Sequence, residues 1–349
     1  MQSKRLLPLL CLLVTLAILA SACVAPTAAP AGSEPAAAAT TAPADEAKPL
    51  VALVYGVKND GFYITMEKGL RDKATELGLD AVADGPSQFD PVQQAPILDA
   101  IIAQNPAAIC IAATDKQAMI EPMKAAFDKG IHIISVDTFI GDTAGDYTTG
   151  DNTFPLSYVG SDNVQGGEIA CQAIIDAMGG KGKMYIQNVK PGISTTDQRE
   201  EGCKKAIDAT GGAVELVGVD YNGDDSSKAA EQTSAVLAAN TDLGGIFGTN
   251  LFSARGAAQA VQNAGLTGVV KIANFDAPED SIVALKDGVV DIVIAQHPYE
   301  IGQVCVEYAQ AAINGEMDKI EKRFATGYTI ITRDNVDSPE SQQAIYKSE

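Results

Sequence analysis

The sequence contains no tryptophan and only two histidines, and aromatic residues of all kinds make up 5% of the chain. Histidine is the side chain most often used for acid–base chemistry near neutral pH. His132 precedes an apolar run and His297 precedes a proline, and neither has an evident nucleophile as partner. The spacings of hydrolase elbows, zinc proteases and phosphate-binding loops are also absent. The sequence therefore predicts that the protein is not an enzyme, and no motif indicates a cofactor.

Basic residues are also scarce, because 25 Lys and Arg stand against 45 Asp and Glu, which gives a formal net charge of −20. Such acidity argues against nucleic acid and anionic membrane surfaces as partners, and it favours solubility. A chain of 349 residues is too long for one ordinary core, and an apolar fraction of 46% can supply more than one. Two folded domains are therefore expected.

The first residues have the pattern of an export signal. Residues 4–19 combine a basic start with an apolar run that is too short for a comfortable membrane span. The next four residues, Ala-Ser-Ala-Cys, resemble the lipobox of bacterial lipoproteins, although an alanine stands where leucine is usual. We expect residues 1–22 to be a lipoprotein signal peptide and Cys23 to carry the lipid. An ordinary signal peptide cut after Ala22 is the alternative.

Residues 23–48 are rich in Ala, Pro and Thr, a composition that cannot bury a core and predicts a disordered tether. A lipidated cysteine followed by such a tether would place a soluble body just outside a membrane. The expected location is the outer face of the cytoplasmic membrane, in a periplasm or at a cell surface.

From residue 50 onward, apolar runs of strand length alternate with helical patterns. The predicted strands are 51–55, 80–83, 108–112, 131–136, 183–189, 214–219, 245–248, 269–275 and 290–295. Such alternation predicts an α/β fold with parallel sheets and right-handed crossovers. The stretch 158–167 interrupts it with a strand end, a Gly-Ser pair and a helix cap, and we interpret this stretch as a hinge between two lobes.

We therefore expect two doubly wound parallel-sheet lobes joined by a hinge that the chain crosses three times, near Ser161, His297 and Ala325. The N-terminal lobe would comprise 49–161 and 298–325. The C-terminal lobe would comprise 162–297 and 326–349. The polar, turn-rich segment 141–155 is expected to be a surface excursion.

Polar side chains follow five of the predicted strands. They are Asp60, Asp137, Asn250, Asp276 and Gln296. An Asp after a strand is most often a helix cap, but ligands of open α/β sheets bind beyond the carboxyl ends of the strands. Arg199 lies near the start of a helix that faces the same end. Five polar strand ends around one cleft favour a binding site there.

The order and spacing of these motifs resemble the ribose-binding proteins of bacterial sugar transporters over roughly 50–315, which implies a type I periplasmic-binding-protein-like fold. The segments that carry the resemblance are 51–63, 136–137, 160–163, 197–202, 248–250, 274–276 and 295–298. The ligand contacts that the resemblance implies are Asp60, Phe62, Tyr63, Asp137, Thr138, Arg199, Asn250, Phe275, Asp276 and Gln296.

Two positions depart from that family's pattern. Thr138 stands where the family has an arginine, and Asp224 or Asp225 stands where it has a third stacking aromatic. Both changes argue against ribose itself and leave the sugar class intact. Aromatic rings can stack on the apolar faces of a sugar, and carboxylates, amides and a guanidinium can bind its hydroxyls.

The sequence thus predicts a monomeric substrate-binding lipoprotein that closes two lobes over a monosaccharide or related polyol and delivers it to the permease subunits of an ABC importer. Asp137 and Asp276 should face each other across the cleft, with Arg199 between or beside them. Their repulsion should keep the empty protein open. The alternative is the same fold as the ligand-sensing subunit of a signalling receptor, for example for a furanose autoinducer.

Two further patterns in the sequence concern a possible metal site and the cysteines. Residues 220–225 with Glu231 resemble a calcium loop, but Asp225 replaces its obligatory glycine, so a turn and helix cap are favoured over a metal site. Among the cysteines of the body, Cys110 and Cys305 are expected to be buried free thiols. The family architecture makes the helices of Cys171 and Cys203 neighbours, which implies a possible disulfide.

Overall fold

The computed structural model describes residues 47–346. The predicted signal peptide, the predicted lipidation site Cys23 and nearly all of the predicted tether lie outside the described residues. Within the described range, no helix combines the length and the apolarity that crossing a membrane requires.

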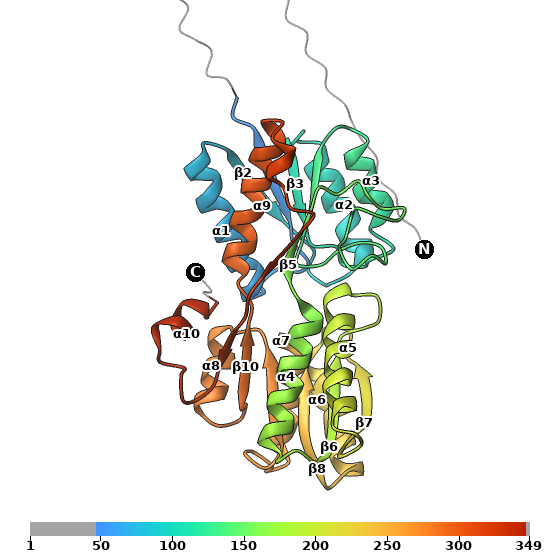
Figure 1. Ribbon diagram of the computed structural model, residues 1–349, viewed down its shortest axis with the longest axis vertical. Helices are drawn as coiled ribbons and strands as arrows, with labels where there is room; N and C mark the ends of the chain where they lie inside the picture. Colours follow the sequence, from blue (N-terminus) through green and yellow to red (C-terminus); the bar gives the residue numbers. More distant parts are fainter. Residues whose placement is uncertain (1–46, 347–349) are drawn as a thin grey trace, which may run out of the picture. The chain divides into compact units, whose positions relative to one another are not determined.

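The described chain forms two six-stranded sheets, one in each of two lobes (Figure 1). The first sheet has the order β11 (Arg323–Thr326), β5 (Tyr158–Ser161), β4 (His132–Val136), β3 (Ala108–Ile111), β1 (Leu50–Val54), β2 (Asp80–Asp84). The second has the order β12 (Thr329–Ile331), β10 (Ile292–Ala295), β9 (Lys271–Phe275), β8 (Leu243–Gly248), β6 (Gly182–Asn188), β7 (Val214–Tyr221). All pairs are parallel except β10–β12, which is antiparallel. The predicted α/β class with two lobes is confirmed.

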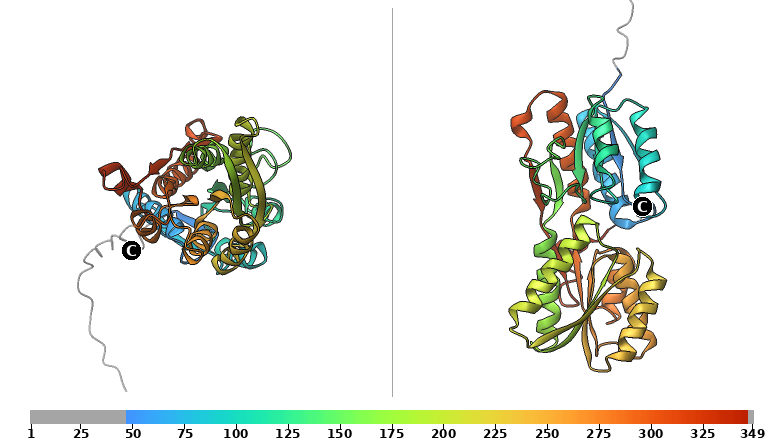
Figure 2. Two further views of the ribbon diagram at one scale, coloured as in Figure 1. Left: turned by 90° about the horizontal axis from the view of Figure 1, so that it is seen from below. Right: turned by 90° about the vertical axis from the view of Figure 1, so that its right-hand side faces the viewer.

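Helices cover both faces of each sheet, as the right-hand view of Figure 2 shows. In the first lobe they are α1 (Gly61–Leu77), α2 (Pro91–Ile102), α3 (Ile120–Phe127) and α9 (Pro298–Ile313). In the second they are α4 (Asn163–Ala177), α5 (Ser194–Ala209), α6 (Ser226–Ala239), α7 (Leu251–Asn263) and α8 (Glu279–Lys286). Strands buried on both faces require such double coverage, and it leaves the carboxyl ends of the strands as the place for a site.

Three connections carry the chain between the sheets. Strand β5 of the first sheet leads into α4, β10 of the second leads into α9, and β11 of the first leads into β12 of the second. Helix α9 packs against α1, and each helix presents a glycine where they cross: a Cβ on Gly302 would overlap the backbone oxygen of Met66, and one on Gly69 that of Tyr299. Both glycines allow the two helix backbones to approach closely.

A short 3₁₀ helix (Met317–Lys319), β11, β12 and the last helix α10 (Pro339–Ala344) have no counterpart in the sequence prediction. Segment 141–155 contains no regular element, but it is more than a surface excursion. Tyr147 within it is buried, and its hydroxyl contacts Ser135 Oγ at 2.7 Å and accepts the Ile140 N–H at 3.2 Å. This tyrosine anchors the segment to the first lobe.

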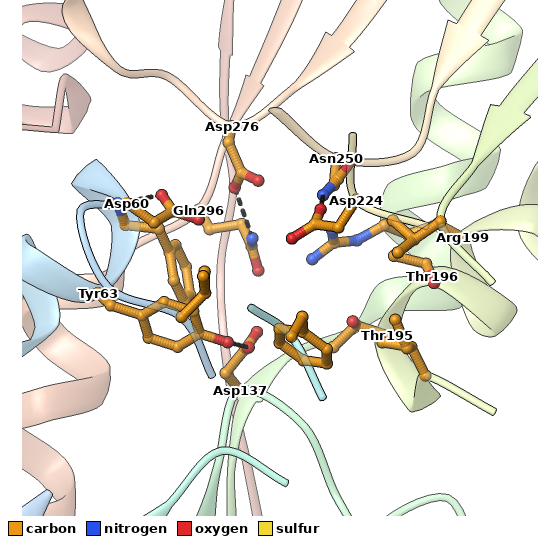
Figure 3. Close-up of a pocket in the computed structure, with 15 residues that line it drawn as sticks. Asp60, Tyr63, Asp137, Thr195, Thr196, Arg199, Asp224, Asn250, Asp276 and Gln296 are labelled. Carbon is orange, nitrogen blue, oxygen red and sulfur yellow. Dashed lines mark hydrogen bonds between the residues drawn. The ribbon is translucent and has the colours of Figure 1, made fainter. Parts of the chain in front are cut away.

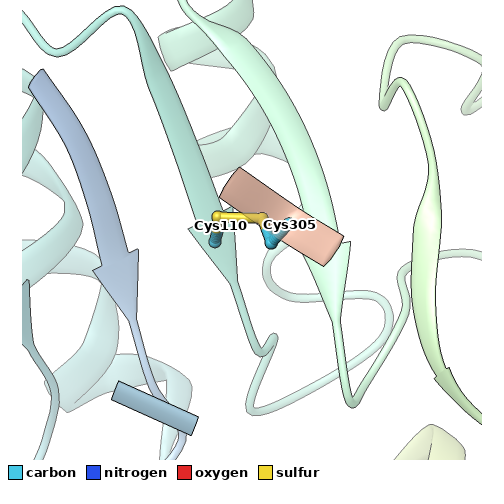
Figure 4. Close-up of a disulfide and its surroundings, with 2 residues drawn as sticks. All are labelled: Cys110 and Cys305. Carbon is cyan, nitrogen blue, oxygen red and sulfur yellow. A yellow bond between two sulfur atoms is a disulfide. The ribbon is translucent and has the colours of Figure 1, made fainter. Parts of the chain in front are cut away.

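Both pairs of cysteines in the described chain form disulfides. Cys171 of α4 is bonded to Cys203 of α5. The expectation of free thiols at Cys110 and Cys305 is wrong, because these two residues are bonded to each other and attach α9 to β3 (Figure 4). The residues are separated by 195 positions, so their proximity follows from α9 returning to the first sheet, which spacing in the sequence does not reveal.

Labelling of the denatured, unreduced protein should therefore find no reactive thiol among these four cysteines, and four after reduction. Replacing Cys110 and Cys305 together by alanine should lower the free energy of unfolding by about 2–5 kcal/mol, because that bond closes the longer loop. The Cys171→Ala, Cys203→Ala pair, which closes a loop with a separation of 32, is the matched control and should cost less. Two reactive thiols before reduction would mean that one bond does not form.

Candidate functional site

A cavity lies between the lobes at the carboxyl ends of the strands, with about 440 Å³ of space free of protein atoms. That figure includes space at the mouth of the cavity that is open to solvent. The residues that line it are Val57, Asp60, Phe62, Tyr63, Phe89, Asp137, Val189, Ile193, Thr195, Thr196, Arg199, Asp224, Asn250, Asp276 and Gln296 (Figure 3). Both lobes contribute, so opening the lobes would take the site apart.

Hydrogen bonds beside the cavity join the lobes in this arrangement. Ser194 Oγ at the start of α5 accepts the Phe139 N–H at 3.0 Å. Lys190 Nζ donates to the Phe89 backbone oxygen at 3.1 Å, and the Lys116 N–H donates to the Gly192 oxygen at 3.1 Å. The structure therefore represents the closed form of the cleft.

Asp137 and Asp276 lie on opposite sides of the cavity, one after β4 and one after β9 (Figure 3). Each is only 6% exposed, and each has a backbone in the left-handed region, with φ of 58° and 79°. Residues other than glycine adopt this conformation at a cost, and such strain concentrates at functional sites. In Asp137 and Asp276 this backbone conformation directs the carboxylate away from the strand and into the cleft.

Four carboxylates face the cavity, and in each the protein holds one oxygen. Asp60 Oδ1 accepts the Phe62 N–H at 2.9 Å as the cap of α1, and Asp137 Oδ2 accepts from Tyr63 Oη at 2.7 Å. Asp224 Oδ1 accepts from Asn250 Nδ2 at 2.7 Å, and Asp276 Oδ1 accepts from Gln296 Nε2 at 2.7 Å. Among the described residues, none donates a hydrogen bond to the second oxygen of these carboxylates. The site thus offers four acceptors to a ligand.

Arg199 supplies the positive charge of the cavity. Its side chain is buried, its Nε donates to Asn163 Oδ1 at 2.9 Å, and its Nη1 donates to the Thr249 oxygen at 2.9 Å. The guanidinium also lies over the ring of Phe275, 3.8 Å from the ring centroid. These contacts fix the group and leave Nη2 as its donor toward the cavity.

The acids of the cavity hold protons more tightly than usual. Burial raises the pKa of Asp60 to about 8, and the nearby Asp276 adds to the effect. Burial also raises the pKa of Asp137 to about 6, although Arg199 opposes the shift. Asp224 has a pKa of about 6, again chiefly because of burial. Charge is therefore disfavoured in the closed cavity unless donors reach these oxygens.

Eight of the ten predicted contacts line the cavity, and two do not. Thr138 is buried and its Oγ1 donates to the Ala113 oxygen at 2.8 Å, so its hydroxyl is used within the first lobe. Phe275 is fully buried in the core of the second lobe and stacks on Arg199 rather than facing the cavity. The sequence predicts that Phe275 contacts the ligand, but in the structure its ring supports Arg199 instead.

Seven residues that line the cavity are not among the contacts predicted from the sequence. They are Val57, Phe89, Val189, Ile193, Thr195, Thr196 and Asp224. In the sequence Asp224 stands out only as a departure from the family's aromatic. The adjacent Asp225 is a helix cap, as predicted, since it accepts the N–H groups of Ser227 and Lys228. Phe89, which lies one residue before the cap of α2, supplies an aromatic wall that no local signal indicated.

The fold and this site define a two-lobed binding protein, and the comparisons agree. A family model described as the periplasmic binding protein domain matches residues 51–317, so the chain belongs to that family. The ribose import binding protein of Haemophilus influenzae is 29% identical over 82% of this chain and 92% of its own length. The D-allose-binding periplasmic protein of Escherichia coli is 28% identical over 72% of this chain and 80% of its own.

Solved structures include a more similar protein. An ABC transporter solute-binding protein from Agrobacterium vitis, bound with α-D-tagatopyranose, is 47% identical, with a TM-score of 0.83 over 86% of this chain and 100% of that one. A second solute-binding protein from the same organism, with bound D-fucose, is 26% identical. Its TM-score is 0.78, and the match covers 85% of this chain and 100% of that one. These relatives are sugar-binding transport proteins and not enzymes, so the predicted resemblance is confirmed.

Proposed function

We propose that the protein captures a monosaccharide in its ring form between the two lobes and delivers it to the transmembrane subunits of an ABC importer. The observation that carries the proposal is the cavity itself, where four carboxylate oxygens and the Arg199 guanidinium lie around a space bounded by aromatic rings. A sugar ring has hydroxyls at its rim and apolar C–H faces, which match these two kinds of group. The tagatose-bound relative supports the same ligand class.

The acceptor-rich lining favours ligands with many hydroxyls. A sugar that lacks one hydroxyl would leave a carboxylate unpaired in a closed site, and such a loss is strongly discriminated against. Phe62, Tyr63 and Phe89 are the rings available for stacking. Arg199 and the hydroxyls of Thr195 and Thr196 are the available donors toward sugar oxygens.

We further propose that the protein works as a monomer outside the cytoplasmic membrane, held by a lipid on Cys23, with residues 23–48 as its tether. The lobes would hinge at the three connections near Ser161, His297 and Ala325.

Replacing Cys23 by serine should release the protein from the membrane fraction. Retention of the Cys23→Ser variant on membranes would exclude lipid anchoring.

The test of ligand class is a thermal and calorimetric screen of the wild-type protein against D-tagatose, D-ribose, D-allose, D-arabinose and D-fucose. We expect D-tagatose to raise the melting temperature and to bind more tightly than D-ribose, because Thr138 and Asp224 replace ribose-family contacts. Ligand present at 100 times its dissociation constant stabilises a protein by about 2.7 kcal/mol, which a melting curve resolves. Binding of none of the five sugars at millimolar concentration would contradict the proposal.

A further inference from the structure

Tyr346, the last described residue, lies beside the cavity although it is 70 positions from Asp276 in the sequence. After α10, the Tyr346 N–H donates to the Ala277 oxygen at 2.9 Å, and Tyr346 pairs with Pro278 as an isolated bridge. Tyr346 is therefore attached to the loop that directly follows Asp276.

The side chain of Tyr346 is 2% exposed and lies between the lobes. Its ring meets that of Phe62 edge-on, with centroids 5.8 Å apart. Phe62 belongs to α1 of the first lobe, whereas Ala277 belongs to the second. Tyr346 thus contacts both lobes in the closed form.

The hydroxyl of Tyr346 connects two residues that line the cavity. It accepts the backbone N–H of Gln296 at 2.9 Å and donates to Asp276 Oδ1 at 3.0 Å. The Gln296 amide donates to the same Asp276 oxygen at 2.7 Å. Burial raises the pKa of Tyr346 well above its ordinary value, so the hydroxyl keeps its proton and remains a donor.

We infer that Tyr346 is a positioning residue of the sugar site, which holds Asp276 Oδ1 from behind so that Oδ2 faces the cavity. This inference rests on the proposed function. Asp276 has a left-handed backbone conformation, so its side chain needs fixed partners to keep one orientation. Without the hydroxyl, only the Gln296 amide would hold the carboxylate, and the Gln296 N–H would lose its acceptor in a buried place.

The chain offers a matched control in Tyr147. This tyrosine is also buried, and its hydroxyl also accepts a backbone N–H, that of Ile140, and contacts a side chain, Ser135. It does not line the cavity. Tyr147→Phe and Tyr346→Phe therefore remove equivalent bonds from the fold, and only the second removes one from the site.

The experiment measures the affinity for D-tagatose by calorimetry and the melting temperature without sugar for wild type and both variants, together with Asp276→Ala and the double variant Asp276→Ala, Tyr346→Phe. We expect both phenylalanine variants to melt earlier by similar amounts. Tyr346→Phe should bind about tenfold more weakly or worse, and Tyr147→Phe should stay within about threefold of wild type. In the Asp276→Ala background, Tyr346→Phe should change the affinity by less than about threefold.

An affinity of Tyr346→Phe within threefold of wild type would overturn the inference, and so would an equal loss in Tyr147→Phe. A full tenfold loss on top of Asp276→Ala would show that Tyr346 acts by another route than Asp276, and it would also overturn the inference. If wild type binds neither D-tagatose nor another sugar of the screen, the proposed function fails instead.

Discussion

Replacing Asp276 by alanine should weaken sugar binding by about thirtyfold or more. The carboxylate is 6% exposed and lies across the cavity from Asp137, and its Oδ2 has no hydrogen-bond donor among the described residues. Its loss would leave ligand hydroxyls unpaired in a dry site, at a cost of roughly 2–5 kcal/mol. It would also remove the acceptor of both Tyr346 Oη and Gln296 Nε2.

Asp276 is not a helix cap, since α8 begins at Glu279 and has Pro278 at its cap position. The matched control is therefore an aspartate that does cap a helix. Asp162 caps α4 by accepting the Gln165 N–H at 3.2 Å and does not line the cavity. Asp162→Ala should lower stability by about 0.5–2 kcal/mol and leave the affinity within about threefold. Calorimetry of both variants against the same sugar makes the comparison, and unchanged affinity in Asp276→Ala would place the site elsewhere.

The sequence was most informative where function and local structure share a signal. Polar residues that follow buried apolar runs identified Asp60, Asp137, Asn250, Asp276 and Gln296, and all five line the cavity. The reason is geometric, because the carboxyl ends of parallel strands meet at one edge of a sheet. The buried strands were also predictable, because a strand covered on both faces appears in the sequence as an uninterrupted apolar run.

Features that depend on distant parts of the chain were not predictable in this way. Tyr346 reaches Asp276 across 70 positions, and Cys110 reaches Cys305 across 195. Nothing near these residues in the sequence indicates their partners. Strands β11 and β12 have only four and three residues, too few for a pattern to emerge. Phe275 fits the family's motif, but its ring points into the core, a detail that only packing decides.

The acids of the closed cavity should make lobe closure dependent on pH. In the closed form the pKa values of Asp137 and Asp224 are about 6 and that of Asp60 is about 8, chiefly because of burial. In an open, solvated cleft these groups would return toward their ordinary value near 3.8. Between about pH 4 and pH 8 the closed form therefore binds more protons than the open form. Raising the pH through this window favours the open form.

The size of this pH effect follows from the pKa values of each carboxyl in the closed and the open form. For one carboxyl that titrates at about 6 when closed and near 3.8 when open, the closed-to-open ratio falls about tenfold between pH 5 and pH 8. Asp137 and Asp224 together would give up to about a hundredfold, and Asp60, whose closed-form pKa is about 8, would add to this change in the same direction. The ratio of the sugar-free protein can be followed by solution X-ray scattering or by a fluorophore pair with one dye on each lobe.

Asp137→Asn is the matched variant, because it keeps the shape of the side chain and removes one titrating group. We expect its closed-to-open ratio to depend on pH about tenfold less than that of the wild type. Saturating sugar should keep the wild type closed at pH 8, because ligand hydroxyls then donate to the ionised carboxylates. A sugar-free ratio that stays constant from pH 5 to pH 8 would show that these acids do not oppose closure, and that the lobes are held apart or together by other contacts.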